Sequence, residues 1–244
     1  MNTLKTLGII PARYASTRFP GKPLVLIQGK SMVQRVYEQV LQSSHISKAI
    51  VATDDQRIYD HVRAFGGHVA MTKTSHQSGT DRCAELAQQE NEYDLVINIQ
   101  GDEPFIAPRQ IDQLVDLLQA NSDFQIATLA KKMETKTDFW NPNIVKVVFD
   151  KQQRALYFSR SPIPHLRGNE DGFPKGNAFK HIGLYGFRRK TLLEIAQLAP
   201  SDLEQIESLE QLRWLDNGYA IAVGLTDIET IGIDTPEDLA KLHL

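Results

Sequence analysis

Three cations lie close together in one short segment near the start of the chain. Arg13, Arg18 and Lys22 fall within ten residues, and Ser16, a threonine and a glycine lie between them. Guanidinium and ammonium groups, together with the backbone N–H groups of a loop, suit the oxygens of a polyphosphate. The segment follows the apolar run 7–10, and ligands of open α/β folds bind beyond the carboxyl ends of strands. We therefore expect a phosphate-binding loop here rather than a solvated basic loop.

Two aspartates far apart in the sequence are candidates for a metal site. Asp102 lies in a Gln-Gly-Asp-Glu-Pro segment that follows a strongly apolar run, and Asp234 precedes a Thr-Pro-Glu-Asp segment. The alternative for Asp102 is an ordinary acidic turn, whereas helix capping explains Thr235 and Glu237 but leaves Asp234 without a role. A carboxylate among phosphates requires a divalent cation, because bare anions repel, and one Mg²⁺ takes one or two protein carboxylates. The expected metal is therefore Mg²⁺ on Asp102 and Asp234.

Two glycine-rich signatures are excluded. Gly29-Lys30-Ser31 resembles the end of a P-loop, but Leu24 occupies the position where the motif requires another glycine. No G-x-G-x-x-G follows any predicted strand, which argues against a dinucleotide-dependent oxidoreductase.

A further polar set has ordinary structural explanations when each member is taken alone. The Ser-Gly-Thr segment at 78–80 is a suitable helix cap, Glu210 and Gln211 suit a solvated helix face, and His181 suits a satisfied buried histidine. Only a wider resemblance, given below, raises these residues to candidates.

The elements that must position these residues alternate along the chain. Apolar runs predict buried strands, and periodic patterns between them predict helices. The strands are expected at 7–10, 49–53, 68–72, 95–99 and 125–129. The helices are expected at 32–41, at 81–89, from 108, and in a segment that Asp54-Asp55 caps and that runs to about 65. This alternation predicts an α/β fold with a mostly parallel sheet covered by helices on both faces.

After residue 130 the pattern changes. Residues 144–149 and 154–158 predict a β-hairpin, 161–178 predict a loop, and 182–187 predict another strand. A closing strand at 220–224 and a helix after Thr235 complete the chain. We expect one α/β domain formed by 1–130 and 190–244, with a smaller β-rich insertion at 131–189.

Composition narrows the class of protein. The 244 residues include 27 Lys plus Arg and 30 Asp plus Glu, a net charge of −3 that argues against a nucleic-acid binder. Residues 1–40 nevertheless carry six basic side chains against one acidic side chain. The single cysteine excludes an intramolecular disulfide. No segment has the pattern of an export signal or a membrane span, so we expect no membrane insertion and a cytoplasmic location.

Nine segments, in order over nearly the whole chain, resemble the 3-deoxy-manno-octulosonate (Kdo) cytidylyltransferases, also called CMP-Kdo synthetases. They are I-I-P-A-R-Y-A-S-T-R-F-P-G-K-P-L, V-A-T-D-D, H-Q-S-G-T-D-R, N-I-Q-G-D-E-P, N-P-N-I-V-K-V-V, A-L-Y-F-S-R-S-P-I-P, H-I-G-L-Y-G-F-R, L-E-Q-I-E-S-L-E-Q-L-R-W-L and G-I-D-T-P-E-D-L. CMP-sialate synthetases have a related basic loop, but theirs usually has K-N after the cations, where this chain has Gly21-Lys22-Pro23. Sugar-1-phosphate nucleotidyltransferases have a G-G-x-G-T-R loop, which is absent here.

The resemblance implies a nucleotide-diphospho-sugar transferase-like fold and the reaction CTP plus Kdo to CMP-Kdo plus pyrophosphate, for lipopolysaccharide biosynthesis. The residues that it implies around CTP are Ala12, Arg13, Ser16, Arg18, Lys22, Ser78, Gly79, Thr80, Arg82 and Asp102. Those that it implies around the sugar acid are Gln100, Arg160, His181, Tyr185, Glu210 and Gln211. Asp102 and Asp234 would ligate Mg²⁺, and the insertion would contribute to a homodimer.

The chemistry follows from charge. The anomeric hydroxyl attacks the α-phosphorus in line, and catalysis requires that the substrates be positioned and the phosphate charge neutralised. The residues expected to do this, and therefore to be catalytic, are Arg13, Arg18, Lys22, Asp102 and Asp234. Bidentate guanidinium binding suits Arg160 to the sugar carboxylate. The alternatives are the same reaction with 8-amino-3,8-dideoxy-manno-octulosonate, CMP-sialate synthesis, and a non-catalytic CTP-binding protein.

Overall fold

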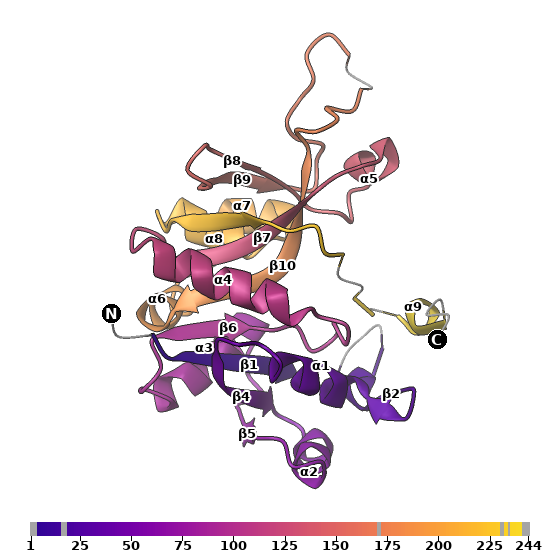
Figure 1. The fold of residues 1–244 in the computed structure, drawn as a ribbon, viewed down its shortest axis with the longest axis vertical. Helices are drawn as coiled ribbons and strands as arrows, with labels where there is room; N and C mark the ends of the chain where they lie inside the picture. Colours follow the sequence, from indigo (N-terminus) through magenta and orange to yellow (C-terminus); the bar gives the residue numbers. More distant parts are fainter. Residues whose placement is uncertain (1–3, 16–18, 170–171, 230–231, 234, 241–244) are drawn as a thin grey trace.

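One twisted sheet runs through the molecule, with helices on both of its faces (Figure 1). The computed structural model describes the chain except residues 1–3, 16–18, 170–171, 230–231, 234 and 241–244. The strands of the sheet are β1 (Thr6–Ala12), β4 (Ile46–Thr53), β5 (Val69–Met71), β6 (Leu95–Asn98), β7 (Ile126–Lys132), β8 (Lys146–Phe149), β9 (Ala155–Ser159), β10 (Phe179–Arg188) and β11 (Ile221–Leu225). A small separate hairpin consists of β2 (Leu26–Ile27) and β3 (Lys30–Ser31).

The helices are short to medium in length. They are α1 (Met32–Val40), α2 (Gln56–Ala64), α3 (Gly79–Gln89), α4 (Pro108–Ala120), α5 (Lys136–Trp140), α6 (Arg189–Ile195), α7 (Asp202–Glu207), α8 (Gln211–Asp216) and α9 (Pro236–Ala240), with a 3₁₀ turn η1 at Lys22–Leu24. No helix in the described part of the chain is long and apolar enough to cross a membrane.

The strand order β11-β7-β10-β6-β1-β4-β5 confirms the predicted α/β class. The pairs β1 with β4, β1 with β6, β4 with β5 and β11 with β7 are parallel, whereas β10 runs antiparallel to β6 and β7. The apolar runs are nearly continuous because both faces of the sheet are buried.

Alternate residues of each strand enter two different cores. Ile10 packs in a core with α1, α2 and α4, whereas Ile9 packs in a core with α3, α6 and α8. The predicted helices are therefore confirmed as two covering layers on opposite faces of the sheet.

Helix starts follow from local capping. Asp55 caps α2 as its place in the sequence predicts, by accepting a hydrogen bond from the Arg57 backbone N–H. Helix α3 begins at Gly79, two residues before the expected start, because Ser78 and Asp81 form a reciprocal capping box.

The segment 131–189 contains the predicted hairpin, since β8 and β9 pair antiparallel. It also contains β10, which is hydrogen-bonded between β6 and β7 in the central sheet. Apolar alternation identifies a strand but does not identify its partners. From 161 to 178 the described residues form no helix or strand, as expected.

Candidate active site

β1 and β6 are neighbouring parallel strands in the middle of the sheet. From β1 the sheet grows through β4 to β5, and β6 is added on the other side of β1. Ligands of open α/β sheets bind in a crevice beyond the carboxyl ends of the strands, so the crevice is expected where the segments after β1 and β6 lie side by side. The cationic loop follows β1, and Asp102 follows β6.

Lys22 and Asp102, two of the predicted site residues, contact each other at this edge of the sheet. The Lys22 ammonium lies 2.7 Å from Asp102 Oδ2, and the side chains are 13% and 30% exposed. The other carboxylate oxygen, Oδ1, has no hydrogen-bond partner among the described residues. A partly exposed carboxylate with an oxygen available suits a magnesium ion that completes its coordination with phosphate oxygens.

Close backbone approach brings the loops together. A Cβ on Gly101 would lie 2.7 Å from the Pro11 carbonyl oxygen, so only glycine permits this packing. The Ile233 N–H donates to the Asp102 carbonyl at 2.9 Å, and this bond brings a segment from near the end of the chain to the crevice.

Three of the predicted site residues, Ser16, Arg18 and Asp234, lie outside the described residues. Their roles therefore remain predictions. Among the described residues no group of three or more His, Cys, Asp or Glu side chains is arranged to hold a metal.

The cationic loop is anchored through Tyr14. The Gly21 N–H donates to the Tyr14 carbonyl at 2.9 Å, with Gly21 at φ +72°. The Arg57 guanidinium carbon lies 3.3 Å from the centre of the Tyr14 ring, and Asp55 pairs with Arg57 at 2.6 Å. Arg57 was missed by sequence reasoning, because its link to the loop depends on how α2 packs. Arg13 is exposed at the start of the loop.

Ala12 and Arg82, both expected around CTP, are core residues. Ala12 is 2% exposed, so its backbone is what remains for a ligand. Arg82 is fully buried and donates from Nη2 to Asp54 Oδ2 at 2.8 Å and from Nη1 to the Thr72 hydroxyl. This network ties α3 to the end of β4, and a direct contact of Arg82 with nucleotide remains a prediction.

The first turn of α3 joins the crevice to α8. The Thr80 hydroxyl donates to Glu210 Oε2 at 2.7 Å, and Ser78 and Gly79 form the start of the same helix. Burial raises the pKa of the Glu210 carboxyl, although the bond from Thr80 and the charge of Arg213 oppose that effect.

Tyr185 and His181 both lie on β10, with ring centres 5.3 Å apart. Tyr185 is packed edge-on against Trp214, and burial together with the Glu210 charge raises the pKa of its phenol. Burial lowers the pKa of the His181 ring to about 3, which keeps the ring neutral.

His181 is held by Thr128 of β7, whose hydroxyl lies 2.8 Å from Nε2. The β10 register shift leaves the carbonyls of Ile182 and Leu184 within hydrogen-bond distance of the Thr128 hydroxyl. The hydroxyl has a single proton and donates it to one of these carbonyls. It therefore accepts from His181, which assigns the ring proton to Nε2.

Arg160 is fixed by main-chain carbonyls. Its guanidinium donates from Nε to the Glu207 carbonyl at 2.7 Å, from Nη1 to Pro142 at 3.2 Å and from Nη2 to Ser208 at 3.3 Å. A guanidinium has five N–H groups, so two further donors are available to a carboxylate.

Gln100 and Gln211 complete the predicted sugar set. Gln100 is partly buried in the segment after β6, and Gln211 is 5% exposed at the first position of α8. The described site residues thus gather at three places: the Lys22–Asp102 contact, the Thr80–Glu210–Tyr185–His181 cluster, and Arg160 with the α7–α8 junction.

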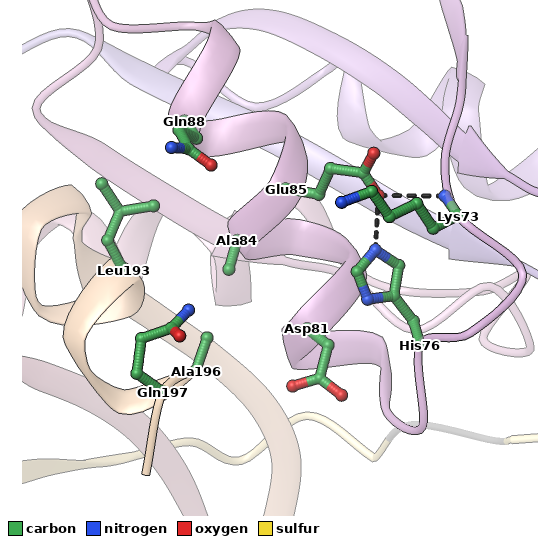
Figure 2. Close-up of a pocket in the computed structure, with 9 residues that line it drawn as sticks. All are labelled: Lys73, His76, Asp81, Ala84, Glu85, Gln88, Leu193, Ala196 and Gln197. Carbon is green, nitrogen blue, oxygen red and sulfur yellow. Dashed lines mark hydrogen bonds and ion pairs between the residues drawn. The ribbon is translucent and has the colours of Figure 1, made fainter.

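A separate hollow of about 260 Å³ lies between α3 and α6 (Figure 2). In it His76 contacts the Glu85 carboxylate, which also accepts from the Lys73 backbone N–H at 3.0 Å. None of the predicted site residues lines it.

The fold and the crevice place the chain among α/β nucleotide-binding transferases, and comparison with known proteins identifies the family. The family model of cytidylyltransferases matches residues 7–228. The chain is 56% identical to the 3-deoxy-manno-octulosonate cytidylyltransferase of Parabacteroides distasonis over 98% of this chain and 96% of the relative. It is 51% identical to that of Cytophaga hutchinsonii over 99% and 97%.

A solved structure agrees with the sequence relatives. A CMP:2-keto-3-deoxy-manno-octonic acid synthetase complexed with CTP superimposes with a TM-score of 0.91 at 44% identity, covering 97% of this chain and 96% of the other. The 4-diphosphocytidyl-2C-methyl-D-erythritol synthase of Anaerococcus prevotii shares the fold alone, with a TM-score of 0.61 at 16% identity over 97% and 95%. The chain belongs to the 3-deoxy-manno-octulosonate cytidylyltransferase family and is a nucleotidyltransferase.

Proposed function

We propose that this enzyme transfers CMP from CTP to the anomeric hydroxyl of Kdo, forming CMP-Kdo and pyrophosphate for lipopolysaccharide biosynthesis. The observation that carries the proposal is the Lys22–Asp102 contact of 2.7 Å beyond the carboxyl ends of the neighbouring strands β1 and β6. It joins a phosphate-binding cation to a candidate metal ligand from segments 80 residues apart. The names of the similar proteins support CTP and Kdo as the substrates.

In this mechanism the chain positions its two substrates and neutralises charge. Arg13, Arg18 and Lys22 bind the triphosphate, and their charges stabilise the pyrophosphate as it leaves. Arg160 binds the sugar carboxylate with the N–H groups that its carbonyl partners leave available. The sugar hydroxyl attacks the α-phosphorus on the side opposite pyrophosphate.

Asp102 and Asp234 would hold Mg²⁺; of the residues that the structure describes, Ile233 donates its backbone N–H to the Asp102 carbonyl. When bound, the ion supplies positive charge to the phosphates and lowers the pKa of the attacking hydroxyl. Asp102 also orients the Lys22 ammonium through their 2.7 Å contact.

The decisive experiment is pyrophosphate release from CTP with Kdo in the presence of Mg²⁺. Turnover that requires all three components supports the proposal, and full turnover after removal of the metal would refute the role of Mg²⁺. Parallel reactions with 8-amino-Kdo and sialic acid decide the acceptor, since each alternative predicts a preference for its own sugar. No release with any acceptor, combined with CTP binding, would indicate the non-catalytic protein.

Two accompanying proposals concern assembly and location. A homodimer would use residues 131–189, whose hairpin exposes Leu156; sedimentation of the whole chain tests it. A cytoplasmic location fits the buried free thiol of Cys83, which a reducing compartment preserves.

A further inference from the structure

Asn98 has a buried carboxamide that the site described above does not use. It is the last residue of β6, and its side chain belongs to a residue that is 2% exposed. Its Oδ1 atom has no hydrogen-bond partner, and no bond from Nδ2 occurs among the described residues. Buried side-chain polar atoms are paired in the large majority of cases, so an unpaired amide on a central strand requires an explanation.

The position of this amide is set by three neighbouring elements. Asn98 lies directly opposite Tyr185 in the antiparallel β6–β10 pair, so the two side chains share one face of the sheet. A Cβ built on Gly79 would lie 3.9 Å from Asn98 Nδ2, which places the amide against the first turn of α3. Asn98 is therefore between the predicted nucleotide segment and the predicted sugar cluster.

The Tyr185 hydroxyl is a second buried polar group, and its hydrogen-bonding capacity complements that of the Asn98 amide oxygen. The phenolic oxygen is also buried and has no hydrogen-bond partner among the described residues, and the nearby Glu210 charge raises the pKa of the phenol further after burial. An amide oxygen can only accept a hydrogen bond, whereas the protonated phenol can donate one. A hydroxyl group can donate to the first and accept from the second at the same time.

We propose that Asn98 is a specificity-determining residue that binds a hydroxyl of the substrate through its carboxamide, opposite Tyr185. This inference rests on the proposed function, because the polyols at the crevice are the sugar acid and the ribose of the nucleotide. Both carry hydroxyl groups, and the KM values for Kdo and for CTP distinguish them. Neither polar group has a hydrogen-bond partner among the described residues, and a bound hydroxyl satisfies both.

The test uses two variants. Asn98→Leu removes both polar atoms of the amide and keeps a side chain of similar size. Asn98→Ser retains one oxygen and replaces the leucine variant if that variant folds poorly. Thr6→Val is the matched control. The Thr6 hydroxyl is also fully buried and has no partner among the described residues, but it lies at the amino end of β1, away from the carboxyl ends of β1 and β6. For each protein the KM values for Kdo and CTP, kcat and the melting temperature are measured. Deoxy analogues of Kdo and dCTP identify the hydroxyl.

We expect Asn98→Leu to keep or raise the melting temperature while one KM rises about tenfold, the effect of one lost hydrogen bond. A rise in the Kdo KM that disappears with one deoxy analogue assigns a sugar-acid hydroxyl. A rise in the CTP KM with lost discrimination against dCTP assigns the ribose. Thr6→Val should change neither KM.

Unchanged KM values for both substrates in a folded Asn98→Leu protein would overturn the inference and leave a bridging water as the partner of the amide. That result differs from failure of the proposed function, in which the wild-type enzyme itself releases no pyrophosphate with CTP and Kdo.

Discussion

The Lys22–Asp102 contact allows a catalytic role of Asp102 to be separated from a structural one. Asp102→Asn keeps the shape of the side chain and removes its charge. The pair spans 2.7 Å with side chains 13% and 30% exposed, and ion pairs of this kind contribute at most about 1 kcal/mol to stability. For a domain of this length, such a loss lowers the melting temperature by roughly 2–4 °C.

The expected effect on catalysis is much larger. Loss of one preorganised group that organises transition-state charge lowers kcat by about 10²- to 10³-fold, equivalent to about 3–4 kcal/mol. The assay is pyrophosphate release with CTP and Kdo over a range of Mg²⁺ concentrations, together with thermal unfolding of the same samples.

The chain offers a matched control in the Lys48–Glu90 pair. It has the same 2.7 Å distance and side chains 30% and 22% exposed, and Lys48 lies near the amino end of β4, away from the crevice. Glu90→Gln should lower the melting temperature by a similar amount and leave kcat unchanged. A kcat within threefold of wild type and an unchanged Mg²⁺ dependence for Asp102→Asn would refute the reasoning.

Three further outcomes are expected. His181→Asn should reduce the loss of thermal stability that occurs as the pH falls from 6.5 to 4. Below pH 6.5 the unfolded wild-type ring binds a proton, whereas the folded ring, with a pKa of about 3, does not. This difference costs the wild-type protein up to about 1.4 kcal/mol of stability per pH unit. Parallel melting curves for the two proteins would contradict this. Gly101→Ala should lower kcat/KM at least about tenfold and destabilise the fold by about 1–3 kcal/mol, because the new Cβ meets the Pro11 carbonyl; unchanged kinetics would show that the loops can separate freely. Arg57→Ala should raise the KM for CTP about threefold, the effect of losing an exposed cation–π contact of about 0.6 kcal/mol on Tyr14, with little change in melting temperature; an unchanged KM would remove Arg57 from loop positioning.

Much of the fold could be predicted from local pattern. The run 7–10 before Pro11 and the run 95–97 are apolar without interruption because both faces of their strands are covered, and this pattern can be recognised in the sequence alone. Asp55 could be recognised as a cap because capping involves only residues within one helical turn.

Strand partners could not be predicted in the same way. β10 has the apolar pattern of any strand, and its place between β6 and β7 depends on pairing with residues at least 47 positions away in the sequence. That placement brings Tyr185 opposite Asn98, and no spacing in the sequence indicates it.

The sequence by itself determined the chemical inventory: three cations after the first strand, two distant aspartates, and motifs specific enough to identify a family. Only the tertiary structure decided which of these side chains are available. From the sequence Arg82 is one more cation, but packing buries it against Asp54. Asn98 is an ordinary strand residue in the sequence, but packing leaves its amide oxygen without a partner among the described residues. The physical reason is that residue type sets which interactions a side chain can make, whereas burial and long-range pairing set which of them it has already made.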